Sequence, residues 1–235
     1  MLTKRQTKSR FQTLREQLLG LVLPIECLVC AQEGHWICLA CLRELLVTRA
    51  TTCTICAKAA ENGLCRRCAA ATQLDGITSL FSYRQTGIQR LVKAVKFAHY
   101  TAAVDFFAEE FGRQLLKRLP EEEWSFVPIP LSAARLRQRG FNQSLLFLES
   151  LAKHWPIEVW EGLKRNRPTA AQAELTKTQR RANVKNCFTV TTKPVPETVV
   201  LFDDVVTTGA TLGEAAKVLR RAGAKSVWAA TVAHG

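Results

Sequence analysis

The chain has 235 residues, enough for one ordinary domain and a small accessory one, and 47% of them are hydrophobic, enough for a sizeable core. Its formal net charge of +13, from 33 basic and 20 acidic residues, favours an anionic partner: a nucleic acid, a phosphorylated small molecule or an anionic membrane surface. No apolar run approaches the roughly 18 residues of a transmembrane segment, so we expect no membrane span.

Residues 1–26 are expected to form an amphipathic lead-in helix. Residues 18–23 are apolar and follow basic residues, as in the first part of a signal peptide. The run is short, however, Glu16 stands beside it, and it lacks a small-residue cleavage site. We therefore expect no export signal in this segment.

Four cysteine pairs with Cys-x-x-Cys spacing follow. Eight of the nine cysteines belong to them: Cys27 and Cys30, Cys38 and Cys41, Cys53 and Cys56, and Cys65 and Cys68. Each pair can direct two sulfurs at one metal, and a structural zinc site takes four ligands in a tetrahedron. Eight thiolates therefore predict two structural zinc sites with no position open for catalysis. Without an export signal, metal-bound thiolates in a reducing cytosol are favoured over disulfides.

The four pairs can share two metals in two main ways. Sequential pairing joins the first pair with the second and the third with the fourth, whereas interleaved pairing joins the first with the third and the second with the fourth. We favour sequential pairing because it closes shorter loops at a lower entropic cost. Iron–sulfur ligation is the main rival to zinc. Residues 27–71 are the expected double zinc ribbon, which needs metal to fold, and Cys187 is interpreted as a small buried apolar residue.

Residues 72–235 are expected to form a second, larger domain, because the composition changes near Asp75. The pattern predicts a strand over residues 77–83 and a helix from Ile88 onward. Another helix starts near Ala102, with apolar residues at helical spacing, and ends at Pro120 and the acidic run that follows it.

The middle of this domain alternates short apolar runs with polar segments. Strands are predicted over residues 124–129, 157–160 and 188–191. A basic loop that closes at Gly140 separates the first of these strands from a helix, which Asn142 caps and which continues to about Lys153. Residues 164–186 are basic and poorly periodic, so we expect a mobile loop over much of that range.

The last part of the chain has the clearest pattern. Residues 198–202 form a continuous apolar, β-branched run that is typical of a buried parallel strand. Leu212, Ala215, Ala216 and Leu219 lie on one face of a predicted helix that ends at Gly223, and residues 226–232 form a final strand. Strands that alternate with helices predict an α/β domain, with a mainly parallel sheet and helices on both faces.

Asp203 and Asp204 follow the first of these two buried strands, and ligands of parallel sheets bind beyond the carboxyl ends of strands. The loop 207–211 then leads into the helix, where backbone N–H groups and threonine hydroxyls can surround a phosphate. Two carboxylates beside such a loop would repel the phosphate but can accept hydrogen bonds from sugar hydroxyls. A ribose 5-phosphate satisfies both demands. A plain helix start with acidic and threonine caps would not account for the whole pattern, and the Gly-Lys-Ser/Thr of a Walker loop is absent.

Residues 199–212 resemble the 5-phosphoribosyl-1-pyrophosphate signature of type I phosphoribosyltransferases. The chain as a whole resembles the ComF family of competence proteins, over nearly its full length. Four features carry that resemblance: the cysteine pairs ahead of the enzyme-like domain, the Val-Pro-Ile-Pro-Leu run at 127–131, the block at 135–143 that ends in Arg-Gly-Phe-Asn-Gln, and residues 165–172 with Arg181 and Asn183.

The resemblance implies a role for each part of the site. Asp203 and Asp204 would be the catalytic pair and bind the ribose hydroxyls of phosphoribosyl pyrophosphate. The 5-phosphate would be held by Val206, Thr207, Thr208, Gly209, Ala210 and Thr211. The loop after Pro130, with Ser132 and Arg135, would receive the pyrophosphate, and residues 164–186 would match the flexible loop that covers the site.

Two functions follow. In the first, the protein is a phosphoribosyltransferase of nucleotide salvage: Mg²⁺ and basic side chains stabilise the departing pyrophosphate, and the candidate side chains are Arg135, Arg137, Arg139, Arg165 and Arg167. No acceptor pocket or general base is recognisable in the sequence. In the second, which we favour, a ComF-like protein of natural transformation keeps the phosphoribosyl pyrophosphate site and binds single-stranded DNA or a helicase-like partner. It would act in the cytoplasm, reaching the membrane through partners.

Overall fold

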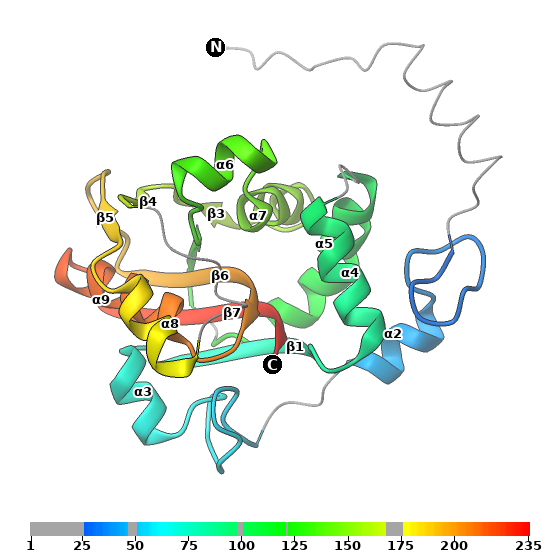
Figure 1. Cartoon of the computed structure of the whole chain (residues 1–235), viewed down its shortest axis with the longest axis horizontal. Coiled ribbons are helices and arrows are strands. Elements are labelled where there is room, and N and C mark those ends of the chain that lie inside the picture. Colours follow the sequence, from blue (N-terminus) through cyan, green and yellow to red (C-terminus); the bar gives the residue numbers. More distant parts are fainter. Residues whose placement is uncertain (1–25, 47–50, 98–100, 121, 168–175) are drawn as a thin grey trace. The chain divides into compact units, whose positions relative to one another are not determined.

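The computed structural model describes residues 26–46, 51–97, 101–120, 122–167 and 176–235. The expected lead-in helix therefore lies outside the described residues, except for Glu26. Contacts between residues divide the chain into two units, Met1–Glu44 and Leu45–Gly235. The first two cysteine pairs, up to Cys41, belong to the first unit, and the other two pairs belong to the second. The second unit also holds every strand that Figure 1 labels.

In its described part, the first unit is a cysteine-rich loop followed by helix α2 (Leu39–Leu45), whose last residue already belongs to the second unit. The loop is closed by an antiparallel bridge between Glu26 and Glu33. The amide of Ala31 donates to the carbonyl of Cys27 at 2.9 Å, and Ala31 has a φ of 61°. This tight turn brings the two cysteines of the first pair to the same side of the loop.

The second unit begins with the same local arrangement. The amide of Ala57 donates to the carbonyl of Cys53 at 2.8 Å, and Ala57 has a φ of 58°. Bridges between Thr52 and Ala59 and between Glu61 and Leu64 close the loop. Helix α3 (Arg66–Thr72) then leads into the sheet. The two halves of the cysteine region are therefore repeats of one turn.

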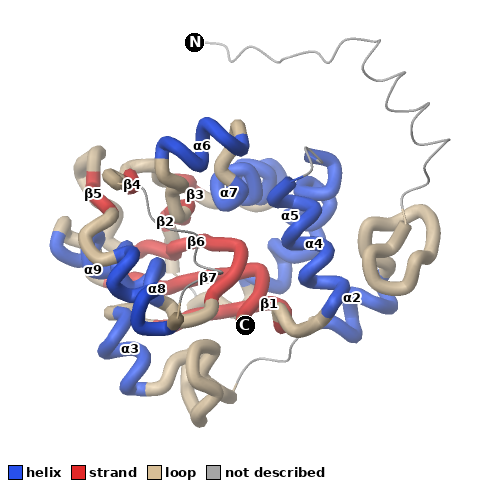
Figure 2. The backbone as a smooth tube through the Cα atoms, in the orientation of Figure 1, coloured by secondary structure: helices blue, strands red, loops and turns tan. Residues whose placement is uncertain are grey.

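The centre of the second unit is a five-stranded sheet with the order β1-β7-β6-β2-β3, and all neighbouring strands in it are parallel (Figure 2). The bounds are β1 (Gly76–Ser82), β2 (Ser125–Pro128), β3 (Glu158–Val159), β6 (Thr198–Val206) and β7 (Ser226–His234). β6 lies in the middle, where Val199 to Leu201 are fully buried. The predicted parallel α/β sheet is confirmed.

Helices cover both faces of this sheet, as predicted (Figure 1). On one face, α5 (Thr101–Leu116) packs on β1 and on α7 (Gln143–His154), and α7 packs on β2, β3 and β6. Side chains of α4 (Thr86–Phe97) line a small apolar cavity together with side chains of α5 and α7, which places α4 on the same face. On the other face, α9 (Ala210–Arg221) packs on β6 and β7 and contacts α3 and α8 (Lys177–Val184).

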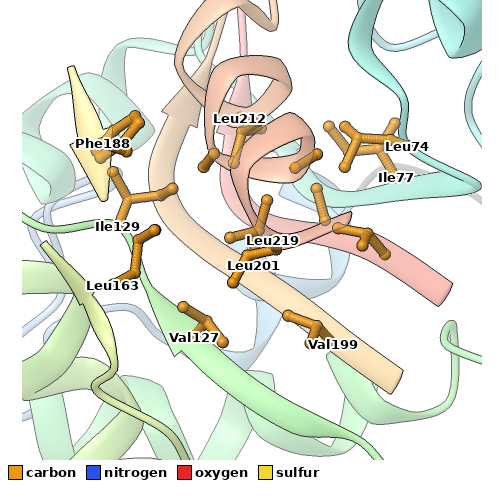
Figure 3. Packing of buried hydrophobic residues seen from close by; sticks show 14 of the residues in the cluster. Leu74, Ile77, Val127, Ile129, Leu163, Phe188, Val199, Leu201, Leu212 and Leu219 are labelled. Carbon is orange, nitrogen blue, oxygen red and sulfur yellow. The ribbon is translucent and has the colours of Figure 1, made fainter. Parts of the chain in front are cut away.

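The core between the sheet and α9 is continuous (Figure 3). Val127, Val199 and Leu201 of the sheet face Leu212 and Leu219 of α9, as the periodicity of the helix predicted. Residues of the second cysteine region, including Cys53 and Leu64, belong to the same buried cluster, and so does Cys187. Cys187 is 0% exposed, which agrees with its interpretation as a buried apolar residue.

Two segments that the sequence pattern assigned to loops contain helices. In the basic segment after Pro130, α6 (Ala133–Arg139) begins at Ser132, whose hydroxyl accepts from the Arg135 amide, and ends at Gly140 with a φ of 80°. In the second segment, α8 begins with a capping box in which Thr176 and Gln179 each accept from the other's backbone amide. The capping residues stabilise both helices in spite of their weak periodicity. Residues 168–175 lie outside the described part of the chain.

A separate two-stranded antiparallel sheet joins β4 (Leu163–Arg165) to β5 (Phe188–Val190). The predicted strand near residue 188 is therefore one arm of this small sheet. Within the described residues, no helix is long and apolar enough to cross a membrane.

Candidate functional site

The sheet has a topological switch point between β2 and β6. The chain leaves β2 through α6 and α7 to reach β3, and it leaves β6 through α9 to reach β7. Because α7 and α9 lie on opposite faces, the carboxyl ends of the two neighbouring strands diverge into a crevice, which is the ordinary ligand site of such sheets. A cleft of about 670 Å³ lies here, and residues 129–131 and 203–212 are among those that line it.

Asp203 and Asp204 both line this cleft and are half-buried. They lie near the carboxyl end of β6, which continues to Val206, beyond the predicted end of the strand. Asp203 Oδ1 accepts from its neighbour's amide at 2.9 Å and from Ser144 Oγ at 3.4 Å, and Asp204 Oδ1 accepts from the Val205 amide at 2.7 Å. Backbone and hydroxyl donors therefore orient both carboxylates at the edge of the cleft.

The predicted phosphate loop joins β6 to α9 along one side of the cleft. All of its predicted residues line the cleft: Val206, Thr207, Thr208, Gly209, Ala210 and Thr211. Gly209 has a φ of 68°, and the Thr208 hydroxyl accepts from the Ala210 amide at 3.4 Å. The first turn of a twelve-residue helix thus lines the cleft, where the helix dipole favours a phosphate.

Three arginines form another side of the cleft. Arg135 and Arg139 are one turn apart on α6, and Arg165 belongs to β4. Burial lowers the pKa of Arg135, and the nearby guanidinium groups of Arg165 and Arg139 lower it further. The Arg165 guanidinium lies 5.1 Å from the centre of the Phe188 ring, and its buried Nε finds no hydrogen-bond partner in the described part of the chain. A bound polyanion would relieve the repulsion among these groups and supply the missing acceptor.

Three of the residues predicted to bind substrate do not line the cleft. Ser132 is 3% exposed and caps α6. Arg137 is exposed and lies on α6 between the two cleft-lining arginines. Arg167 donates to the carbonyls of Asn183 and Lys185 at 3.1 and 2.6 Å, at the end of α8. In this conformation Ser132 and Arg167 have structural contacts, and their direct role in binding stays a prediction.

The cleft also contains four polar side chains to which the sequence analysis assigned no role: Tyr83, Gln138, Gln143 and Ser144. Gln143 is 5% exposed, and its buried Nε2 has no hydrogen-bond partner within the residues that the structure describes. It is the first residue of α7 and follows the cap Asn142, which accepts from the Ser144 amide and donates to the carbonyl of Ile129. The block at 135–143, which carries part of the family resemblance, ends at Gln143. That block was the feature of the sequence that could have identified Gln143 as a site residue.

The eight paired cysteines form two groups of four, one in each unit. In each group the four sulfurs lie within 4.8 Å of one another, and the groups follow the sequential pairing that we favoured. Cys30 Sγ and Cys38 Sγ are 3.7 Å apart, and Cys56 Sγ and Cys65 Sγ are 3.6 Å apart. Four sulfurs at about 2.3 Å from a tetrahedral zinc would be separated by about 3.8 Å. Both donor sets therefore fit a structural metal site.

Known proteins resemble the chain in sequence. A model of the phosphoribosyl transferase domain matches residues 143–235. DNA utilization protein YhgH from Salmonella typhimurium is 32% identical over 223 residues, which are 88% of this chain and 96% of the relative. Competence protein ComFC from Bacillus subtilis is 28% identical over 199 residues, 80% of this chain and 79% of the relative. Competence protein F from Haemophilus influenzae is 37% identical over 114 residues, 47% and 48% of the two chains.

These similarities confirm the predicted fold class. A phosphoribosyltransferase domain with a parallel sheet and helices on both faces follows two four-cysteine clusters in the chain.

Proposed function

The chain belongs to the ComF family of competence proteins, and we propose on this basis that it serves the uptake or use of DNA and that its cleft binds phosphoribosyl pyrophosphate. One observation supports the ligand above all. A single cleft at the switch point combines an acidic strand end, a helix-start loop and a cluster of arginines.

Each part of phosphoribosyl pyrophosphate has a matching group in the cleft. We assign the 5-phosphate to the loop 207–211, where helix amides and threonine hydroxyls donate. The ribose hydroxyls donate to Asp203 and Asp204. The pyrophosphate faces Arg135, Arg139 and Arg165, whose clustered charges it neutralises. The buried Gln143 side-chain amide, which has no hydrogen-bond partner among the described residues, donates to a ligand oxygen.

The same arrangement suits transfer of the phosphoribosyl group, which is the second candidate function. When the bond between the anomeric carbon and pyrophosphate breaks, positive charge develops on the sugar and negative charge on the leaving group. Carboxylates beside the ribose and guanidinium groups beside the pyrophosphate stabilise these opposite charges. Mg²⁺ bound with the ligand would neutralise part of the pyrophosphate charge.

A titration of the wild-type protein with ligand fragments tests the assignment. In the presence of Mg²⁺, we expect ribose 5-phosphate and pyrophosphate each to bind weakly and phosphoribosyl pyrophosphate to bind more tightly than either, because it joins two subsites. Each fragment should compete with the complete ligand. If saturating pyrophosphate leaves the affinity for phosphoribosyl pyrophosphate unchanged, the assignment of the arginines is wrong.

For the DNA-related role, we propose that the protein binds single-stranded DNA through its phosphate backbone. The net charge of +13 supports this, as does the similarity to a DNA utilization protein and to a competence protein. Backbone binding releases counterions, so the logarithm of the affinity should fall linearly with the logarithm of salt concentration, by about 0.7 per phosphate contacted. A fluorescence titration with a labelled oligonucleotide measures this slope, and an affinity that is independent of salt would contradict backbone binding.

We further propose that both cysteine clusters hold structural zinc in a cytoplasmic protein. Each group found among the described residues consists of four cysteines, and the sulfur separations fit zinc. Elemental analysis of the purified protein should find two zinc ions per chain. Iron in their place, with the visible absorption of a cluster, would identify iron–sulfur ligation instead.

A further inference from the structure

The second cysteine cluster lies directly beneath the phosphate loop. Ile55 belongs to the turn between its ligands Cys53 and Cys56, and a Cβ built on Gly209 would lie 2.6 Å from Ile55 Cδ1. The Ile55 side chain therefore packs against the loop at Gly209, the residue with a positive φ. A side chain at Gly209 would displace the end of the Ile55 side chain and would also strain the backbone, because the φ of Gly209 is positive.

A second contact comes from α3, which begins after the ligand Cys65 and carries the ligand Cys68. Thr72, at the end of α3, is 5% exposed, and its hydroxyl donates to the carbonyl of Cys68 at 2.8 Å. A Cβ on Gly213, in the first turn of α9, would lie 3.0 Å from Thr72 Cα. The two helices thus approach with backbone nearly against backbone.

The turn and the sheet are also joined by hydrogen bonds. The Ile77 amide of β1 donates to the carbonyl of Asn62 at 2.8 Å, and the Thr54 amide donates to the carbonyl of Gly63 at 2.9 Å. At the other end of α3, Arg220 of α9 donates to the carbonyl of Gln73 and to the carboxylate of Asp75. The cysteine region is therefore fixed both to strand β1 of the sheet and to α9, the helix that follows the loop.

From these contacts we infer that the second cluster is the support of the phosphate loop, with Ile55 and Thr72 as positioning residues, and that metal in this cluster and ligand in the cleft bind cooperatively. The four thiolates hold the Ile55 turn and the start of α3 in place only when a metal joins them, because so small a segment cannot fold around four thiols alone. Loss of the metal frees both contacts, and the loop then loses the arrangement that its phosphate requires.

Cooperativity of this kind is reciprocal, since a factor by which metal raises ligand affinity is also the factor by which ligand raises metal affinity. A structural zinc site with no influence on the loop would show neither effect. The inferred cooperativity (the ligand half of this inference) rests on the proposed phosphoribosyl pyrophosphate site. The inferred support of the loop by the cluster (the loop half) does not, because the order of the loop can be measured without ligand.

Amide hydrogen exchange of the ligand-free protein tests the loop half. We expect residues 207–213 to exchange at least about fivefold faster after Ile55→Ala, which keeps all four cysteines, with metal content unchanged. Ile55→Val should restore most of the protection. Lys58→Ala, at an exposed position of the same turn, is the matched control and should leave exchange unchanged. Wild-type protection of the loop in Ile55→Ala would overturn the inference.

Metal exchange tests the cooperativity. Zinc removal from the second cluster by Cys65→Ser should weaken phosphoribosyl pyrophosphate binding by at least about fivefold, the lower end of ordinary coupling between sites. In the wild-type protein, saturating ligand should slow chelator extraction of one of the two metals by a similar factor. Cys30→Ser removes a ligand of the other cluster, and an equal loss of affinity there would show a general effect of metal and overturn the assignment.

The two proposals fail in different ways. If the wild-type protein binds no phosphoribosyl pyrophosphate, the proposed ligand is wrong, while faster loop exchange in Ile55→Ala still supports the role of the cluster. If the ligand binds equally to wild type, Ile55→Ala and Cys65→Ser, the ligand stands and the support role is wrong.

Discussion

At the scale of single residues, the arginines of the cleft separate by position on one short helix. Arg135 and Arg139 are one turn apart and line the cleft, whereas Arg137 between them is exposed. The sequence could supply all three as candidates, since it shows three basic residues two apart. It could not distinguish them, because the basic segment was expected to be a loop, in which alternate residues have no defined face.

Arg135→Gln is therefore expected to weaken phosphoribosyl pyrophosphate binding by at least about tenfold, the effect of a hydrogen bond to a charged group. Binding of ribose 5-phosphate, which lacks the pyrophosphate, should change little. Arg137→Gln removes the same charge from the same helix and serves as the control in calorimetric titrations. Equal losses in the two variants would show that net charge, rather than a pyrophosphate subsite, governs affinity.

Gln143 provides a second test at this scale, in which stability and binding change in opposite directions. Its buried Nε2 has no hydrogen-bond partner in the described ranges of the chain, and such a group costs about 1–3 kcal/mol of stability. Gln143→Leu, of similar volume, should raise the free energy of unfolding of the ligand-free protein and lower the affinity for phosphoribosyl pyrophosphate. Denaturant unfolding and calorimetry measure the two quantities. A destabilised variant with unchanged affinity would give Gln143 a purely structural role.

At the scale of helices and strands, apolar periodicity predicted the buried elements, whereas capping residues alone did not predict the short polar helices. The buried strands β6 and β7 and the apolar face of α9 followed from the sequence because burial on one or both faces leaves a continuous or helical apolar pattern. α6 and α8 were missed because both are short and polar, and their caps are their main stabilising feature. The caps Ser132 and Thr176 were visible in the sequence, but single capping residues are too common to predict a helix alone.

Packing between α5 and α7 includes a polar contact with a consequence for acid stability. Burial alone would raise the pKa of Asp105, but hydrogen bonds from Lys153 and Ser150 of α7 outweigh it and hold the pKa below its usual value. The ionised form therefore stabilises the fold above the pKa of the unfolded chain, and this contribution is lost as the pH falls through the lower pKa of the folded protein.

Asp105→Asn should accordingly reduce stability near neutral pH and make the free energy of unfolding less dependent on pH between about 5 and 2. The side chains of Lys153 and Asp105 are 60% and 45% exposed, so the loss should stay below about 1 kcal/mol. Urea unfolding across this pH range measures the effect. Glu109→Gln, at an exposed position of the same helix, is the control, and identical pH profiles for the two variants would contradict the account.

At the scale of the whole molecule, composition separates all four cysteine pairs from the rest of the chain. The contacts instead group the last two pairs with the sheet, in the unit Leu45–Gly235. The spacing predicted two four-cysteine clusters and favoured sequential over interleaved pairing, which the two groups follow. It could not show that the second cluster shares a core with the sheet, because the contact of Ile55 with Gly209 joins residues 154 positions apart. Long-range packing of this kind leaves no periodic signal in one sequence.

The cleft was predictable only in part, because some of its residues are contiguous in the sequence and others are brought together by long-range packing. The acidic strand end and its loop are contiguous in the sequence, so their pattern could be interpreted without the fold. Arg165, Gln143 and Tyr83 reach the cleft from three separate elements, and only the topology brings them together. Binding of phosphoribosyl pyrophosphate by this cleft depends most of all on the acidic strand end and its loop.

Calorimetric titration of the metal-loaded protein with phosphoribosyl pyrophosphate and Mg²⁺ tests this binding most directly. We predict one site per chain for the wild type and a loss of affinity of at least about tenfold for Asp204→Asn, since the ribose hydroxyls lose a charged acceptor worth about 1.5–3 kcal/mol. Glu122→Gln, which removes an exposed carboxylate elsewhere, should bind like the wild type. Absence of binding to the wild type, or equal affinity in all three proteins, would contradict the account.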